Sequence, residues 1–188
     1  MVNHQKPTIA IFGGSFDPPH QGHQLIVEKA LENLQIDKLL VVPAYLNPFK
    51  TSTLADALTR LAWCHTLFDP IDGVEVDDYE IKEGKSTVTS QSVKHFNQTY
   101  HVKYLIVGSD NLSTLTKWHA FEWLNDTVTW VIATRDDHHL DTDALKKWEL
   151  LPIEAPMSST QIREEKDLQF IDTKIKKSVK HILEGKNT

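Results

Sequence analysis

Short runs of apolar residues alternate along the chain with longer stretches in which apolar residues recur every three or four positions. The short runs are rich in β-branched residues and predict strands, whereas the longer stretches predict helices with one buried side. The predicted strands cover residues 8–12, 38–42, 73–76, 104–107, 128–133 and 152–154. The predicted helices cover residues 23–34, 54–68, 90–98, 158–165 and 173–183, with one or two short helices within residues 112–124.

The alternation of strands and helices predicts an α/β fold, a Rossmann-like, doubly wound parallel sheet with helices on both faces. The chain contains no repeat and no linker, so we expect residues 1–188 to form a single domain. Long polar connections cover residues 47–53 and 78–89. Loops of this kind at the carboxyl ends of strands are where such folds bind ligands.

The composition narrows the class of function. Hydrophobic residues make up 40% of the chain and charged residues 24%, which is typical of a globular domain. The formal net charge of -6 argues against a broad basic face for nucleic acid, so the expected partner is a small molecule. No apolar run is long enough to span a membrane, and the single cysteine, Cys64, is expected to be a buried helix residue. We therefore expect a cytoplasmic protein, and a homo-oligomer remains open.

The most informative segment is GGSFDPPHQGH, residues 13–23, which lies between a predicted strand and a predicted helix. The N-terminus of a helix offers unpaired N–H groups and a partial positive charge, which suit an anion. Gly13 and Gly14 allow the backbone to turn sharply and approach a ligand. His20 and His23 lie three residues apart, which places both rings on one face, and Gly22 leaves room between them. Two imidazoles aimed at one point can bind phosphate oxygens during phosphoryl transfer.

Two other kinds of site match this segment less well. His20 and His23 have a spacing that metal ligands can share, but no third ligand is evident nearby and the HExxH motif is absent. A dinucleotide-binding oxidoreductase carries GxGxxG after its first strand, and this chain does not. A phosphate site is therefore favoured, with Asp17 as an organiser of the loop.

A second motif, MSSTQIR, occupies residues 157–163. Taken alone, three hydroxyl residues followed by an arginine are typical of a helix N-cap with a surface arginine. Beside the first motif they indicate a phosphate site, because hydroxyls and N–H groups at a helix start can hold the β- and γ-phosphates. Arg163 can offer a planar fork to a departing pyrophosphate.

The first motif resembles the HxGH motif of the nucleotidyltransferase superfamily. More narrowly, it resembles the GG[ST]FDPxHxGH opening of the bacterial nicotinate-mononucleotide adenylyltransferases. The second motif resembles the superfamily's ISSTxIR, with Met157 in place of isoleucine, and the resemblance extends from Ile9 to Arg163. It implies that His20, His23 and Arg163 are catalytic. It also implies an ATP site at Gly13, Gly14, Ser15, Phe16, Gly22, Lys50, Gly108, Asp110, Ser158, Ser159 and Thr160.

Positions between the two motifs support the resemblance. Residues 41–50 resemble the strand-end segment of the family, which closes with Pro-Pro-His-Lys, and Lys50 is a candidate phosphate contact. Asp110 stands in a Gly-x-Asp turn after a strand, where it can accept hydrogen bonds from the ATP ribose. Arg60 matches an arginine on the next helix, and a structural role is open for it.

The resemblance also implies an acceptor site. Trp118 matches a tryptophan that stacks on the pyridine ring of the acceptor, a use that suits a flat aromatic face. Arg135 matches a further family arginine. Residues 84–93 depart from the family, because they read GKSTVTSQSV where Gly-x-Ser-Tyr-Thr-x-Asp-Thr is usual. Thr87 and Ser90 are candidates to replace the missing threonine pair.

The reaction implied by the resemblance is in-line attack of the acceptor phosphate on the α-phosphorus of ATP, with Mg²⁺ offsetting part of the triphosphate charge. The expected acceptor is nicotinate mononucleotide, and the product is nicotinate adenine dinucleotide, the precursor of NAD. Several alternatives remain: nicotinamide mononucleotide or phosphopantetheine as the acceptor, cytidylyl transfer, or a nucleotide-sensing module without turnover.

Overall fold

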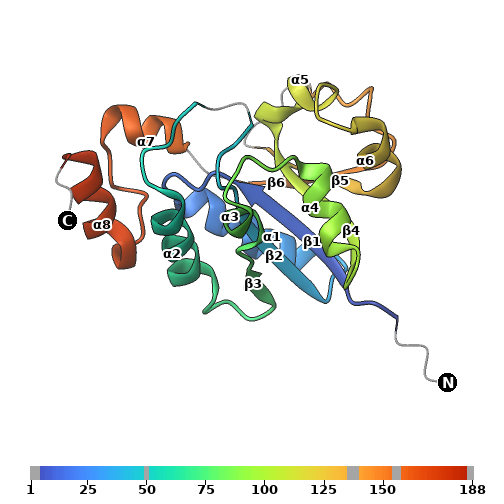
Figure 1. Cartoon of the computed structure of the whole chain (residues 1–188), viewed down its shortest axis with the longest axis horizontal. Coiled ribbons are helices and arrows are strands. Elements are labelled where there is room, and N and C mark those ends of the chain that lie inside the picture. Colours follow the sequence, from blue (N-terminus) through green and yellow to red (C-terminus); the bar gives the residue numbers. More distant parts are fainter. Residues whose placement is uncertain (1–4, 49–50, 135–139, 154–157, 186–188) are drawn as a thin grey trace.

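The computed structural model of the chain describes residues 5–48, 51–134, 140–153 and 158–185. Over these ranges the chain forms a six-stranded sheet in the order β3-β2-β1-β4-β5-β6 (Figure 1). All five pairings of neighbouring strands are parallel. The predicted Rossmann-like parallel sheet is therefore confirmed. The strands are β1 (Thr8–Gly14), β2 (Lys38–Pro43), β3 (Val74–Val76), β4 (His101–Gly108), β5 (Thr129–Thr134) and β6 (Trp148–Pro152).

Helices cover both faces of the sheet (Figure 1). One face packs against α1 (Gln21–Asn33), α2 (Ala57–Phe68), α7 (Ser159–Glu165) and α8 (Thr173–Leu183). The other face packs against α3 (Tyr79–Glu83), α4 (Thr89–Phe96), α5 (Leu112–Leu115) and α6 (Phe121–Thr127). In the described part of the chain, none of the helices has both the length and the apolar character needed to cross a membrane.

The central strand β1 is buried on both sides, which explains its continuous apolar run. Ala10 and Phe12 belong to the hydrophobic cluster under α1 and α2, whereas Ile9 and Ile11 belong to the cluster on the opposite face. The alternation follows from the two-residue period of a strand. Cys64 is fully buried in the first cluster, as predicted. Burial raises the pKa of its thiol, which keeps it in the unreactive protonated form.

The predicted start of the second helix, at residue 54, is wrong, because α2 begins at Ala57. The backbone N–H groups of Leu54 and Ala55 instead donate to the carboxylate of Asp17, at 2.7 and 3.0 Å. Asp56 then caps the helix by accepting from the N–H of Thr59 at 2.8 Å. The hydrogen bonds to Asp17 therefore keep residues 54 and 55 out of the helix, although their sequence fits the helical pattern.

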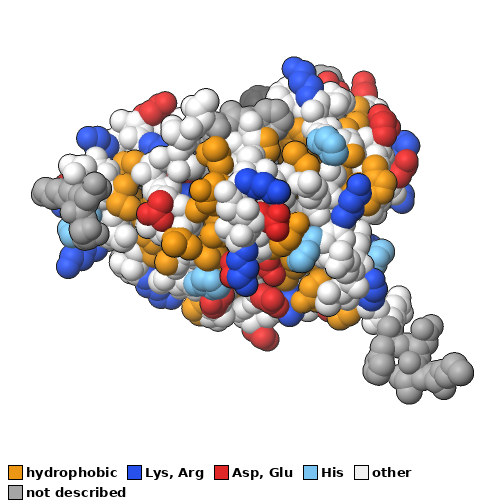
Figure 2. Space-filling model, viewed as in Figure 1, with side chains coloured by type: hydrophobic (Ala, Val, Ile, Leu, Met, Phe, Trp, Pro, Cys, Tyr) orange, Lys and Arg blue, Asp and Glu red, His pale blue; other side chains and the backbone are white. Residues whose placement is uncertain are grey.

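The predicted last strand, residues 152–154, is displaced, since β6 covers Trp148–Pro152. Of its residues only Leu151 is buried, and the apolar side chains of Trp148 and Leu150 are exposed, so the apolar residues of this edge strand do not mark its bounds. A short helix, α3, also lies within the segment predicted to be a polar connection. Figure 2 shows acidic and basic side chains interspersed over the face on which α4 lies.

The order of the strands places the ligand site. The chain moves outward from β1 through β2 to β3, then crosses to β4 and moves outward in the other direction. The carboxyl ends of β1 and β4, at Gly14 and Gly108, therefore lie side by side where the order reverses. Parallel sheets of this kind bind ligands in the crevice at that point.

Candidate active site

The loop that follows β1 is anchored by a buried aromatic residue. Phe16 has a φ of 47°, a left-handed conformation that non-glycine residues rarely adopt, and its side chain is 1% exposed. Its ring packs edge-on against Phe12 at a centroid distance of 5.3 Å. A Cβ atom on Gly14 would lie 3.2 Å from the Phe16 ring, which explains the glycine at that position. Phe16 was predicted to contact ATP, but its side chain lies in the core, so that only its backbone can serve the loop.

Hydrogen bonds from backbone N–H groups orient the imidazole rings of the two histidines. His20 is the N-cap of α1, and its Nδ1 accepts from the N–H of Gly22 at 3.1 Å. The Nδ1 of His23 accepts in turn from the N–H of His20 at 3.1 Å, which completes a capping box. Because each Nδ1 accepts a hydrogen bond, a neutral ring carries its proton on Nε2. The two ring centroids are 4.0 Å apart.

Packing fixes the histidine rings in place. His20 is only 3% exposed. The His23 ring lies 4.9 Å from the Phe16 ring and 6.0 Å from the Phe12 ring, measured between centroids. Neither ring therefore has to be ordered when a ligand binds, which lowers the entropic cost of binding.

The second motif docks onto the first. Ser158 is the N-cap of α7, with a capping box to Gln161. The hydroxyl of Ser159 donates to the carbonyl of Pro18 at 3.0 Å, and Nη1 of Arg163 donates to the carbonyl of Asp17 at 2.6 Å. These bonds join positions 141 and 146 residues apart in the sequence. The helix that carries Arg163 is therefore hydrogen-bonded to the Asp17–Pro18 segment, which precedes His20 by two residues.

Two hydrogen bonds orient the guanidinium of Arg163. Its Nη2 donates to the hydroxyl of Thr160 at 3.1 Å, beside the bond from Nη1 to Asp17. A guanidinium has five N–H donors, and these two bonds set the plane of the fork. Both bonds hold the Arg163 side chain against the loop that carries Asp17.

A buried arginine connects the loops that follow β1 and β2. Arg60 is 0% exposed, and its Nη1 donates to the carbonyls of Ser15 and Ala44, at 2.7 Å each. Its Nη2 donates to the carbonyl of Tyr45 at 2.7 Å, and its Nε to that of Ala55 at 3.1 Å. Burial lowers the pKa of the guanidinium, although a group with so high an ordinary pKa stays protonated. The structural role left open for Arg60 is therefore confirmed.

Asp17 performs the organising role predicted for it. Its side chain is 2% exposed, and its carboxylate accepts from the backbone of residues 54 and 55 while its carbonyl accepts from Arg163. One residue thus joins the phosphate loop to the segment before α2 and to α7.

At the end of β4, Gly108 makes room for an acidic side chain. A Cβ atom on Gly108 would lie 2.4 Å from Oδ1 of Asp110. Asn111 donates to this oxygen at 3.2 Å and to the carbonyl of Gly108 at 3.3 Å, which holds the turn. The carboxylate of Asp110 is exposed directly after the carboxyl end of β4, and its predicted contact with the ATP ribose stays a prediction.

The predicted acceptor residues that the structure describes come from two segments on the face of the sheet covered by α3 to α6. Thr87 is 4% exposed and lies between α3 and α4, where its hydroxyl donates to the carbonyl of Lys85 at 3.3 Å. Trp118 lies between α5 and α6 and packs edge-on against Trp130, with centroids 6.2 Å apart. Its indole N–H is buried and has no hydrogen-bond partner among the residues that the structure describes. Ser90 joins the two segments, because its Oγ lies 3.0 Å from Nδ1 of His119.

Some predicted positions are not placed by the structure. Lys50, Arg135 and Met157 lie outside the described residues. Gly13 is the next-to-last residue of β1, Ser15 begins the loop after β1, and Gly22 is buried in the first turn of α1.

A comparison of the sequence with models of protein families identifies the family of the chain. The cytidylyltransferase-like family model matches residues 11–165. The chain belongs to the cytidylyltransferase-like family. The matched residues include both sequence motifs, residues 13–23 and residues 157–163.

Named relatives narrow the family further. A protein of Sulfurovum sp. (strain NBC37-1) named "Probable nicotinate-nucleotide adenylyltransferase" is 64% identical over 186 residues, which are 99% of either chain. A protein of the same name from Campylobacter fetus is 42% identical over 95% of this chain and 98% of its own. These comparisons confirm the resemblance to nicotinate-mononucleotide adenylyltransferases within the cytidylyltransferase-like family.

Solved structures support the fold. Nicotinic acid mononucleotide adenylyltransferase of Plasmodium falciparum complexed with NaAD superposes with a TM-score of 0.72 at 22% identity, covering 97% of this chain and 96% of that one. The same protein complexed with APC gives a TM-score of 0.70 at 20% identity, covering 95% of each chain. At these identities the likeness establishes the fold of the cytidylyltransferase-like chain and not its substrate.

Proposed function

We propose that this chain transfers the adenylyl group of ATP to nicotinate mononucleotide, giving nicotinate adenine dinucleotide and pyrophosphate in NAD biosynthesis. The observation that carries the proposal is the 2.6 Å bond from Arg163 to the carbonyl of Asp17, which fastens the second motif to the histidine loop. The names of the relatives at 64% and 42% identity support the choice of acceptor. We also propose that residues 1–188 act as one domain.

The proposed triphosphate site consists of donors that are already oriented. His20 and His23 direct their Nε2–H groups toward phosphate oxygens, and the first turn of α1 adds the positive end of its dipole. Arg163, the hydroxyl of Thr160 and the backbone N–H of Ser159 approach from α7 and bind the β- and γ-phosphates, whereas the Ser159 hydroxyl donates to Pro18. Preorganised donors of this kind stabilise the charge that develops in the transition state without having to reorganise.

In the proposed step, an oxygen of the acceptor phosphate attacks the α-phosphorus of ATP in line with the bond to the β-phosphate. That P–O bond breaks, and its electron pair leaves on pyrophosphate, where Arg163 neutralises part of the charge. A phosphate oxygen needs no general base, and no covalent enzyme intermediate forms. Catalysis then consists of positioning and charge stabilisation.

Mg²⁺ is proposed to bind together with ATP. In nucleotide sites this ion is held mostly by phosphate oxygens and water, with one or two carboxylates. No cluster of three or more His, Cys, Asp and Glu side chains suited to a metal occurs among the described residues. The Asp17 carboxylate already accepts two backbone N–H bonds, so the phosphates and water are expected to provide most of the ligands. When bound, the ion offsets part of the triphosphate charge.

The acceptor is proposed to bind between Trp118, which stacks on the pyridine ring, and the segment that contains Thr87. Arg135 belongs to the same proposed site. The carboxylate of nicotinate and the amide of nicotinamide differ in charge and in hydrogen-bond donors, so these neighbours determine which acceptor is preferred.

The test is turnover with ATP, measured as pyrophosphate release, with nicotinate mononucleotide, nicotinamide mononucleotide and phosphopantetheine as separate acceptors. We expect nicotinate mononucleotide to give the highest kcat/KM. Faster turnover with another acceptor would replace the substrate and retain the reaction type. Tight ATP binding without pyrophosphate release for any acceptor would overturn the enzymatic function in favour of a nucleotide-sensing module.

A further inference from the structure

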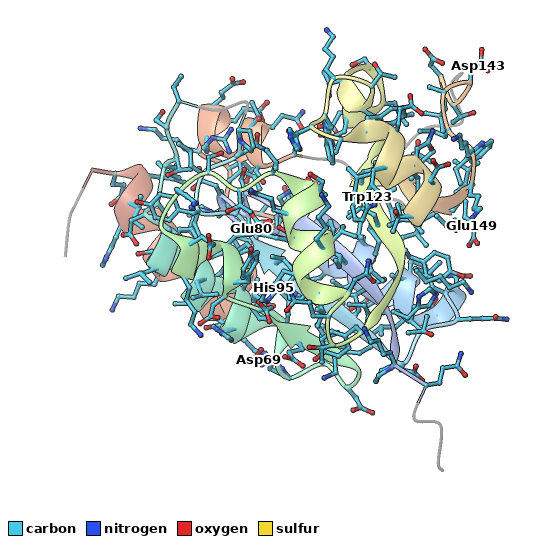
Figure 3. All side chains as sticks on the ribbon, turned by 45° about the vertical axis from the view of Figure 1, so that its right-hand side comes forward. Asp69, Glu80, His95, Trp123, Asp143 and Glu149 are labelled. Carbon is cyan, nitrogen blue, oxygen red and sulfur yellow. The ribbon has the colours of Figure 1, made fainter. Side chains whose placement is uncertain are left out.

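A buried carboxylate lies beneath the segment proposed to bind the acceptor. Glu80, on α3, is 8% exposed, and its Oε1 accepts from the hydroxyl of Ser92, on α4, at 2.6 Å. Ser92 is 2% exposed. Figure 3 shows Glu80 in the central part of the molecule, close to α4. The bond therefore joins the two short helices on either side of residues 84–88.

The same turn of α4 is held from a second direction. The hydroxyl of Ser90 is buried and lies 3.0 Å from Nδ1 of His119, the residue that follows Trp118. The first turn of α4 is thus connected to α3 through Ser92 and to the Trp118 turn through Ser90. Thr87, buried two residues before α4, lies within the segment that these contacts hold.

Packing alone does not require a carboxylate at this position. Removing a carboxylate from water costs free energy, and burial raises the pKa of Glu80 to about 7. Apolar side chains of similar volume often replace buried polar groups without loss of stability. What an apolar residue cannot supply is the directional bond to Ser92, which fixes how α3 and α4 lie relative to each other.

We propose that Glu80 and Ser92 are a positioning pair for the acceptor, holding residues 84–90 against the turn that carries Trp118. This rests on the proposed function, in which these segments bind nicotinate mononucleotide. The pair lies on the α3 and α4 face of the sheet, whereas α7, with Arg163, lies on the other face. Loss of the pair therefore affects the binding of the acceptor and leaves the binding of ATP unchanged.

The test is steady-state kinetics with ATP and nicotinate mononucleotide. Ser92→Ala and Glu80→Ala are each expected to raise KM for the acceptor about tenfold, the size of one lost side-chain hydrogen bond. KM for ATP and kcat should stay within about twofold, because the triphosphate site is untouched. Glu80→Gln keeps an oxygen that accepts from Ser92, so its KM for the acceptor should stay near that of the wild type. The double variant should be no worse than the more affected single variant.

Two control variants separate positioning from loss of stability. Ser178→Ala removes a hydroxyl that accepts from the indole N–H of Trp63 at 3.1 Å on the opposite face of the sheet. Val179→Ala opens a cavity at a fully buried position of α8. Neither control should raise KM for the acceptor. If Glu80→Ala does not fold, KM for the acceptor in Ser92→Ala, compared with that in Ser178→Ala, still tests the positioning role.

Amide hydrogen exchange on the ligand-free protein gives a readout that does not depend on turnover. Exchange in residues 84–92 should be at least about tenfold faster in Ser92→Ala than in the wild type and unchanged in Ser178→Ala, because local opening follows the lost bond. Unchanged exchange in this segment, or equal rises in KM for ATP and for the acceptor, would overturn the proposal. A wild-type chain without turnover would instead overturn the proposed function, and faster exchange in Ser92→Ala would then retain only the holding role of the pair.

Discussion

The stability of the folded chain should decrease as the pH rises from the ordinary pKa of Glu80 to the higher pKa that it has in the folded chain. Burial raises the pKa of this carboxyl from its ordinary 4.5 to about 7, although the bond from Ser92 opposes part of the rise. Between these two pH values the folded state holds a proton that the unfolded state has released. Stability is therefore full below the lower value and is lost as the pH approaches and passes the higher one. At about 1.4 kcal/mol for each pKa unit, the loss is about 3 kcal/mol.

The comparison of wild type with Glu80→Gln isolates this effect, because the amide does not titrate. Urea unfolding at several pH values from about 4.5 to 8.5 gives the free energy of unfolding of both proteins. The free energy of unfolding of Glu80→Gln, relative to that of the wild type, should rise by about 3 kcal/mol between pH 4.5 and about 7. At higher pH the difference between the two proteins should stay constant. Other titrating groups, such as Asp77, whose pKa burial also raises, contribute to both proteins and cancel in the difference. A difference that does not change with pH would show that Glu80 is hydrated and has its ordinary pKa.

Three further outcomes are expected. His20→Ala and His23→Ala should each lower kcat about a hundredfold or more, as loss of an oxyanion donor does; near-normal turnover in both would refute their role. Arg60→Met should lower the free energy of unfolding by about 3–5 kcal/mol in urea denaturation, because it leaves buried carbonyls unpaired, and a loss under 1 kcal/mol would contradict the bonding described for it. Gly108→Ala should raise KM for ATP severalfold by displacing the Asp110 carboxylate, and an unchanged KM would remove Asp110 from the ATP site.

The sheet could be predicted from the sequence where strands are buried on both faces. β1 and β4 carry uninterrupted apolar runs because helices cover both of their sides, and their positions were predicted to within a few residues. β6 was displaced because an edge strand exposes most of its side chains and needs no apolar run. The start of α2 was wrong because the carboxylate of Asp17, 37 residues earlier, takes the N–H groups that would have begun the helix.

The two halves of the candidate site could be predicted because each carries several chemically distinctive residues at a short spacing. The sequence did not predict the contacts of single charged residues such as Glu80 and Arg60. Glu80 stands in a polar stretch of the sequence and looks like a solvated side chain, and only the packing of α3 against α4 shows that it is buried. The four carbonyls bound by Arg60 come from three separate segments, so no local pattern predicts that they converge.

The central claim is that the two histidines and Arg163 bind one triphosphate. A crystal structure of the chain with a non-hydrolysable ATP analogue tests it most directly. We predict the phosphates at the start of α1, with oxygens within hydrogen-bond distance of Nε2 of His20, Nε2 of His23 and the guanidinium of Arg163. Phosphates bound away from the carboxyl ends of β1 and β4, or in contact with only one of the two motifs, would contradict the account.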